Sequence, residues 1–183
     1  MKKSWRDHLW DWFKAILIAL AFTLVLRNFV FIPVVIDGTS MAPTIEGNDR
    51  ILMTSFSAIK RFDVIVFQDS KGKTYVKRVI GLPGERISYK DDALYIDDQQ
   101  IDEKFLSQYQ DEKVNKHELW TSDFTLEEIT SKKTVPKNQF FVLGDNRRSS
   151  KDSRYFGTIN ENQVIGKVIF IYGPREHIGF IHK

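Results

Sequence analysis

The sequence predicts a mostly β protein, in which an antiparallel β-sheet domain follows one N-terminal transmembrane helix. Two observations lead to this prediction. The only long apolar run lies near the N-terminus, and beyond it short stretches rich in β-branched and aromatic residues alternate with turn residues. Helix-length amphipathic segments do not separate these stretches, so a doubly wound α/β fold is not expected. The length of 183 residues fits one anchored domain.

The N-terminal apolar run predicts an uncleaved membrane anchor. Residues 15–26 carry no charge, and the apolar character from 12 to 32 supplies the roughly 20 residues that spanning requires. Bulky residues follow this core, whereas a cleavable signal peptide would have small residues there. The basic residues before the core predict that 1–14 lie in the cytoplasm, that 15–34 form the anchor and that 35–183 lie outside the membrane.

Beyond the anchor, the spacing of short apolar stretches predicts strands. These stretches are 50–53, 62–67, 75–82, 86–89, 94–96, 140–143 and 164–172. Residues 89–95 predict a hairpin that turns at Asp91-Asp92. The polar segment 102–133 is expected to be an insertion or a small cap on the sheet, with solvated charges and a capping box at 125–128.

Composition excludes several kinds of function. The net charge is +3, and residues 1–14 supply two of these charges, with four basic residues against two acidic ones. The rest of the chain is close to neutral, so no nucleic-acid partner is expected. The absence of cysteine excludes a thiol nucleophile and disulfides, and no ligand spacing predicts a metal site. We therefore expect neither a metal nor a cofactor.

Ser40 is a candidate nucleophile because it lies in a turn-like stretch directly after the anchor, between Gly38 and Pro43. A Ser/His/Asp triad would need a well-placed histidine, and none of the four has such a context: His8, His117, His177 and His182. Lys77 lies in a predicted strand and could act as a base if burial lowered its pKa. On the residues alone, an ordinary turn serine and a solvent-facing strand lysine are the favoured interpretations.

The stretch from Gly144 to Arg154 mixes carboxylates, guanidinium groups and hydroxyls after a predicted strand. Its acidic and basic side chains could form an ion-pair network that holds a loop, and a serine there could orient a neutral lysine amine. A solvated polar turn is the other interpretation.

Four motifs in order resemble those of the bacterial type I signal peptidases, or leader peptidases, and the compact Gram-positive members most of all. They are Ser40-Met41-Ala42-Pro43-Thr44, the stretch 47–51, the stretch 77–85, and Gly144-Asp145-Asn146-Arg147 with Asp152-Ser153-Arg154. The resemblance extends from the anchor to about residue 172. It implies a serine protease with a Ser/Lys dyad that needs no cofactor.

The resemblance also assigns roles to single residues. It implies that Ser40 is the nucleophile, that Lys77 is the general base and that Ser150 hydrogen-bonds and orients Lys77. It implies supporting roles for Arg78, Asp145, Asp152 and Arg154. The Ser40 backbone N–H would meet the oxyanion. Some relatives carry a serine where this chain has Gly38, so a second oxyanion donor stays open.

The implied substrates are preproteins with signal peptides, cleaved after small residues at −1 and −3 at the outer face of the cell membrane. An extended substrate could pair with exposed strand edges, and Ile36 and Val76 are candidates for lining its pockets. The alternatives are a self-cleaving Ser/Lys peptidase of the repressor type, a catalytically silent homologue and a tethered structural β domain. A repressor-type peptidase is expected to carry a DNA-binding module, which this sequence does not show. A silent homologue is expected to lack Ser40 or Lys77, and both are present. The ordered motifs disfavour a purely structural domain.

Overall fold

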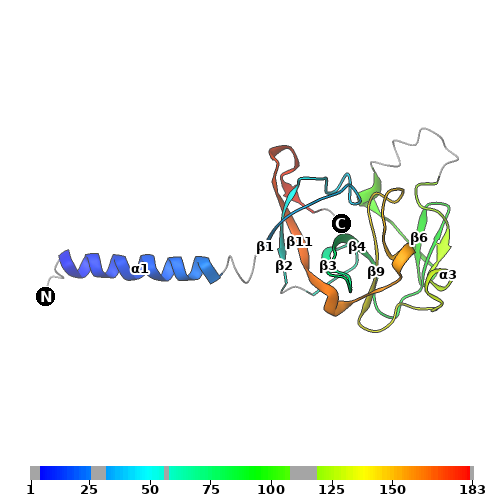
Figure 1. Ribbon diagram of the computed structural model, residues 1–183, viewed down its shortest axis with the longest axis horizontal. Helices are drawn as coiled ribbons and strands as arrows, with labels where there is room; N and C mark the ends of the chain where they lie inside the picture. The colour runs from blue at the N-terminus through cyan, green and yellow to red at the C-terminus, as the bar shows by residue number, and fades with distance from the viewer. Residues whose placement is uncertain (1–4, 26–31, 56–57, 108–118, 182–183) are drawn as a thin grey trace.

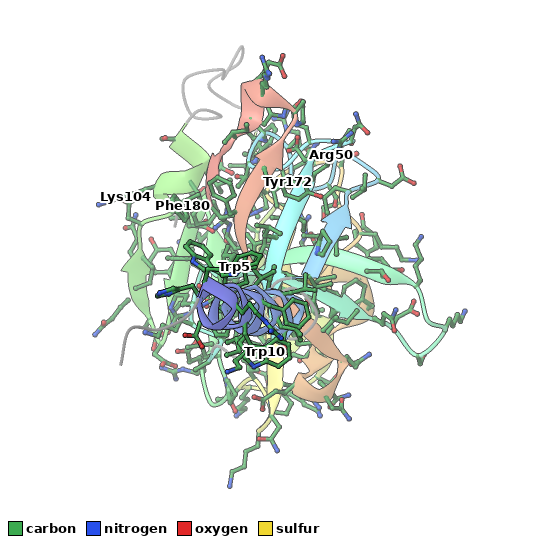
Figure 2. All side chains as sticks on the ribbon, turned by 90° about the vertical axis from the view of Figure 1, so that its left-hand side faces the viewer. Trp5, Trp10, Arg50, Lys104, Tyr172 and Phe180 are labelled. Atoms are coloured by element: carbon green, nitrogen blue, oxygen red, sulfur yellow. The ribbon has the colours of Figure 1, made fainter. Side chains whose placement is uncertain are left out.

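The computed structural model describes residues 5–25, 32–55, 58–107 and 119–181, and it shows one long helix that extends away from a β domain (Figure 1). The helix α1 covers Trp5–Val25 and begins ten residues before the predicted anchor. Its first half is polar and aromatic: Lys14 Nζ lies 3.7 Å from Asp11 Oδ1, and Trp5 and Trp10 project to different sides of the helix (Figure 2). Its second half is apolar, and the side chains from 16 to 23 are exposed.

The described part of the chain contains no helix that combines the length and the apolarity needed to cross a membrane. The predicted anchor at 15–34 falls partly on residues 26–31, which lie outside the described residues. Its predicted end is wrong, because Ile32–Val35 form strand β1, paired with β2. The residues of β1 alternate between half-buried and exposed, and Pro33 is tolerated because β1 is an edge strand.

The remaining strands form two antiparallel sheets. The first sheet has eight strands in the order β1-β2-β11-β3-β4-β9-β10, with β12 paired to β11, and the second has the order β7-β6-β5-β8. The bounds in the first sheet are β2 Arg50–Thr54, β3 Val64–Gln68, β4 Thr74–Gly81, β9 Gln139–Leu143, β10 Ile159–Asn160, β11 Val164–Gly173 and β12 Gly179–Phe180. Those in the second are β5 Ile87–Lys90, β6 Ala93–Ile96, β7 Gln99–Ile101 and β8 Phe124–Thr125.

The predicted mostly β fold is therefore confirmed, and so is the hairpin. Strands β5 and β6 pair with Lys90 opposite Ala93. Asp91 and Asp92 both have positive φ, 51° and 64°, which is the backbone shape of a two-residue turn between twisted strands.

The described parts of 102–133 belong to the second sheet and to its core. Strand β8 pairs with β5, and the short helix α3 (Leu126–Thr130) starts at the predicted capping box of Thr125 and Glu128. Phe105 and Leu106, in the 3-10 helix η2 (Lys104–Leu106), are buried in the same core cluster as Leu126. Residues 108–118 of this segment lie outside the described residues.

Short helical turns complete the β domain at three places that matter for the site. Helix α4 follows the polar loop after β9, η3 precedes β11, and η4 follows it; their bounds are Ser153–Phe156, Glu161–Gln163 and Arg175–His177. Because β9 and α4 flank the loop 144–152, this loop is held at both ends beside the first sheet.

Candidate active site

Ser40 lies in a turn that is held to the sheet at both ends. The Ile36 N–H donates to the Asp49 carbonyl at 2.9 Å, and the Asn48 N–H donates to the Ile36 carbonyl at 2.9 Å. Met41 and Ile45 are buried in the same core cluster as residues of β2 and β3. Ser40 therefore projects from a turn whose two flanks are both packed, so its position is well defined.

Gly38 supplies a backbone conformation that this turn requires. Its φ of +106° lies in the region that L side chains rarely adopt. Gly38 and Ser40 both line the groove described below, whereas Gly38 brings no side-chain donor to it. Gly38 therefore cannot add a side-chain hydroxyl to the Ser40 backbone N–H, which is the predicted oxyanion donor.

Lys77 comes from β4 and meets Ser40 across 37 residues of sequence. Its Nζ lies 2.6 Å from Ser40 Oγ and donates a hydrogen bond to the Val76 carbonyl at 3.0 Å. The lysine is 3 % exposed. The two residues that the sequence suggested as nucleophile and base are therefore in direct contact.

Burial changes the proton affinity of Lys77. Desolvation of the ammonium form lowers the pKa of Lys77 from 10.5 to about 8, against the opposing attraction of the Asp152 and Asp145 carboxylates. At pH 7, about one tenth of the amine is then neutral, compared with well under one thousandth for an ordinary lysine. A neutral amine beside a serine hydroxyl can accept the proton of that hydroxyl.

The buried pair of Arg78 and Asp145 joins β4 to the loop after β9. Arg78 Nε and Nη2 donate to the two carboxylate oxygens of Asp145 at 2.8 and 2.6 Å, and both side chains are fully buried. Arg78 Nη1 also donates to the Phe62 carbonyl at 2.8 Å. Two parallel bonds give this pair a defined geometry, which places Asp145 beside Lys77.

Asp152 and Arg154 hold the other end of the same loop. Asp152 Oδ2 accepts the Gly144 N–H at 3.0 Å, and its carboxylate accepts Arg154 Nε and Nη2, both at 2.9 Å. Arg154 Nη2 also donates to the Arg147 carbonyl at 2.7 Å. The predicted supporting residues thus lie around the loop rather than against Ser40.

Ser150 differs from its predicted role. Its Oγ is buried and has no hydrogen-bond partner within the described part of the chain. The expected hydrogen bond to Lys77 is therefore wrong for this structure, because the Lys77 amine donates to the Val76 carbonyl instead. Ser150 packs against Gly144, where any Cβ atom would overlap with Ser150 Oγ and with the Ser40 carbonyl oxygen. Gly144 is thus required for the close approach of the two loops.

Arg147 forms a buried network that sequence reasoning missed. Its guanidinium donates to Glu103 Oε1 at 2.6 Å, to the Tyr89 hydroxyl at 2.7 Å and to the Gly144 carbonyl at 2.9 Å. Burial raises the pKa of the Tyr89 phenol well above its usual value. Glu103 was expected to be solvated, as part of the polar segment 102–133, but it is 8 % exposed and paired. An isolated glutamate in a polar segment carries no periodic signal of burial.

A groove of about 310 Å³ opens beside the Ser40–Lys77 pair. It runs between the end of β1 with the Ser40 turn and the first half of β4, and its lining residues are Val34–Met41 without Thr39, Lys73–Lys77 and Lys151. Ile36 and Val76, the residues predicted to contact substrate, both lie in this lining. Residues 74–77 of β4 pair with β3, whereas pairing with β9 begins only at Arg78.

Among the residues that the structure describes, no histidine lines the groove beside Ser40. His177 Nδ1 lies 2.7 Å from Asp49 Oδ1, and His8 lies in α1. His117 and His182 lie outside the described residues. In the ranges that the structure describes, no group of three or more His, Asp or Glu side chains could hold a metal ion.

Comparison with known proteins identifies relatives over nearly the whole chain. Residues 9–173 match the family described as signal peptidase, peptidase S26. The chain is 45% identical to the signal peptidase I of Bacillus caldolyticus over 183 residues, which is 98% of this chain and 97% of that one. It is 34% identical to signal peptidase IB of Staphylococcus aureus over 177 residues, or 92% of each chain.

A solved structure is also similar. The crystal structure of a signal peptidase I from Enterococcus faecalis V583 is 46% identical in sequence and superposes with a TM-score of 0.58. The match covers 62% of this chain and 98% of that chain. The β domain is therefore of a kind already seen in solved structures.

Proposed function

The chain belongs to the peptidase S26 family of signal peptidases, and we propose that it removes signal peptides from exported preproteins with a Ser40/Lys77 dyad. It is a serine protease. The observation that carries the proposal is the 2.6 Å separation of Ser40 Oγ and Lys77 Nζ, at a lysine whose burial lowers its pKa to about 8.

The geometry supports a reaction in two steps. Neutral Lys77 accepts the Ser40 hydroxyl proton as Oγ attacks the scissile carbonyl carbon, and the resulting ammonium returns that proton to the leaving amine nitrogen. Lys77 then accepts a proton from the water that attacks the acyl carbon, and it returns this proton to Ser40 Oγ as the acyl–Oγ bond breaks and the acid product leaves. The Val76 carbonyl, which accepts one N–H of the amine, favours an orientation in which the nitrogen lone pair faces Ser40.

The oxyanion of each tetrahedral intermediate meets the backbone N–H of Ser40 in this proposal. Such a donor is effective because it is already oriented before charge develops on the carbonyl oxygen. Arg78, Asp145, Asp152 and Arg154 support the site by holding the loop 144–152. Gly38 provides the turn.

The groove supports an extended substrate with small side chains. Residues 74–77 of β4 lack a β9 partner, so a preprotein segment can add to this edge by main-chain hydrogen bonds. Its side chains would then alternate between the groove and solvent. Walls formed by Ile36 and Val76 leave room for small residues such as alanine at −1 and −3.

We further propose a single-pass membrane location, with 1–14 in the cytoplasm and the β domain, from β1 onward, outside. Residues 15–25 of α1 carry no charge and would lie in the bilayer core. Five large apolar side chains in the second half of α1 are more than half exposed: Ile16, Leu17, Ile18, Leu20 and Phe22. Exposed Tyr172 lies in β11, which is on the side of the β domain nearest α1 (Figure 1).

A processing assay on a model preprotein tests this proposal with the full chain in detergent. Ser40→Ala and Lys77→Ala are each expected to lower cleavage by about 10³-fold or more, because each removes a group that acts in every step. Ser149→Ala and Lys71→Ala, at exposed positions outside the groove, are matched controls and should cleave normally. Full processing by folded Lys77→Ala protein would contradict the dyad.

A further inference from the structure

The groove beside Ser40 has a cationic edge, which we define as Lys73 and Lys151. Both side chains are exposed, and both line the groove together with Ser40 and Lys77. Among the described residues, neither ammonium group is paired with a carboxylate. Asp37 is the one acidic side chain in the described lining, so the groove carries a net positive charge.

Lys73 is held in place by the turn between β3 and β4. The Asp69 carboxylate accepts the backbone N–H groups of Lys71 and Lys73 at 2.8 and 2.9 Å, which closes this turn. The Lys73 Nζ lies 5.4 Å from the centroid of the Tyr75 ring, within reach of a cation–π interaction. The ammonium group is therefore kept over Tyr75 and beside the groove.

Lys151 reaches the groove from the loop that supports the site. Its neighbours Ser150 and Asp152 are both buried, and Asp152 accepts the Gly144 N–H. Lys151 and Tyr75 also line an adjoining pocket of about 240 Å³. The cationic edge thus lies where the groove meets a second hollow, and both of its backbone positions are well anchored.

We propose that the cationic edge selects preproteins that carry an acidic side chain about four residues from the scissile bond. The proposal rests on the proposed function. Lys73 directly precedes β4 and lies four residues from Lys77, or about 13 Å along an extended chain, so a substrate paired with residues 74–77 meets it at that spacing. An aspartate or glutamate there would complement two ammonium groups, and a lysine would be repelled by them.

An anionic membrane surface is the other ligand class that two lysines could suit. A peptide carboxylate is favoured because both lysines line the same groove as the nucleophile and the base. Recognition of lipid headgroups would not require the lysines to border this groove.

The test compares peptides that differ at one position. A peptide with alanine at −1 and −3 carries Glu, Gln or Lys in turn at −6, −5, −4 and −2 and at each position from +1 to +5. The kcat/KM is measured with the full chain in neutral detergent at low salt. An exposed ion pair typically changes affinity by about two- to fivefold, so a Glu-to-Gln ratio of about fivefold is expected at one position near the predicted spacing. High salt should reduce this ratio.

Variants then assign the preference to the cationic edge. Lys73→Gln and Lys151→Gln should each lower the Glu-to-Gln ratio, and Lys73→Glu should reverse it in favour of the Lys peptide. Lys71→Gln, in the same turn but outside the groove lining, should keep the wild-type ratio. The Gln peptide reports the activity of each variant without the proposed ion pair.

Three outcomes would overturn the inference. The first is a Glu-to-Gln ratio near one at every position, and the second is an unchanged ratio in both lysine variants. The third is a lysine effect on the Gln peptide that appears only with phosphatidylglycerol vesicles, which would assign the edge to lipid. The failure of the proposed function would look different, because no peptide would then be cleaved in a Ser40-dependent way.

Discussion

Replacing Lys77 by methionine is expected to stabilise the fold at pH 7 while it abolishes activity. Lys77 is 3 % exposed, and the cost of burying its ammonium form lowers its pKa from 10.5 to about 8. At about 1.4 kcal/mol for each pKa unit, this difference corresponds to roughly 3 kcal/mol of destabilisation when the lysine is charged. Methionine has a similar shape and carries no charge to desolvate.

The effect should depend on pH in a defined direction. Because the pKa of Lys77 is lower in the folded state, the unfolded state binds more protons between about pH 8 and 10.5. The free energy of unfolding of the wild type should therefore rise with pH across this window by roughly 3 kcal/mol from Lys77 alone. The advantage of Lys77→Met should be full below about pH 8 and should vanish near 10.5.

Urea unfolding of the full chain in detergent, followed by circular dichroism at pH 7, 8, 9 and 10, measures this difference. Other groups that titrate in the same window are common to both proteins and cancel when the two are subtracted. Lys71→Met, at an exposed position in the turn before β4, is the matched control and should differ little from the wild type at any pH. A stability difference for Lys77→Met that does not change with pH, or a loss of stability at pH 7, would refute the reasoning.

Two further predictions concern activity. The kcat/KM of the wild type should rise about tenfold per pH unit below pH 8 and level off near pH 8, because only neutral Lys77 can act as a base. A kcat/KM that keeps rising up to about pH 10 would contradict the lowered pKa of Lys77. Gly144→Ala should lower kcat by about 10²-fold, because its Cβ would displace Ser150 and the Ser40 carbonyl by a few tenths of an ångström or more, and misplacement on the ångström scale is costly. Gly179→Ala, which has open space for a Cβ, should keep wild-type turnover in the same assay.

Much of the β fold could be predicted because its strands are short, apolar and separated by turn residues. The Asp91-Asp92 hairpin is an example, since two adjacent aspartates tolerate the positive φ that the turn needs. Strand β1 was missed because its residues continue the apolar run of the helix, and apolar composition alone does not separate the two. Only pairing with β2 decides that 32–35 are extended.

The candidate pair Ser40 and Lys77 could be predicted from motif order, whereas the surrounding hydrogen bonds could not. The sequence pointed to Ser150 as the partner of the lysine, but the Val76 carbonyl takes that place, and a backbone acceptor carries no sequence signature. Glu103 was missed for a related reason. Its burial depends on Arg147, which arrives from 44 residues away.

Lys77 and Arg78 are adjacent in sequence but contact different partners: Lys77 contacts Ser40, and Arg78 pairs with Asp145. The register of β4 decides which side chain meets which partner. Side chains alternate across β4, so a shift of one residue would exchange the two and bring Arg78 to Ser40. A guanidinium keeps its proton at any usable pH and could not act as a base. Arg78 finds Asp145 only in the alignment that sets it opposite Leu143 of β9. The buried ion pair therefore fixes the strand register, and this register decides which of the two cationic side chains reaches Ser40.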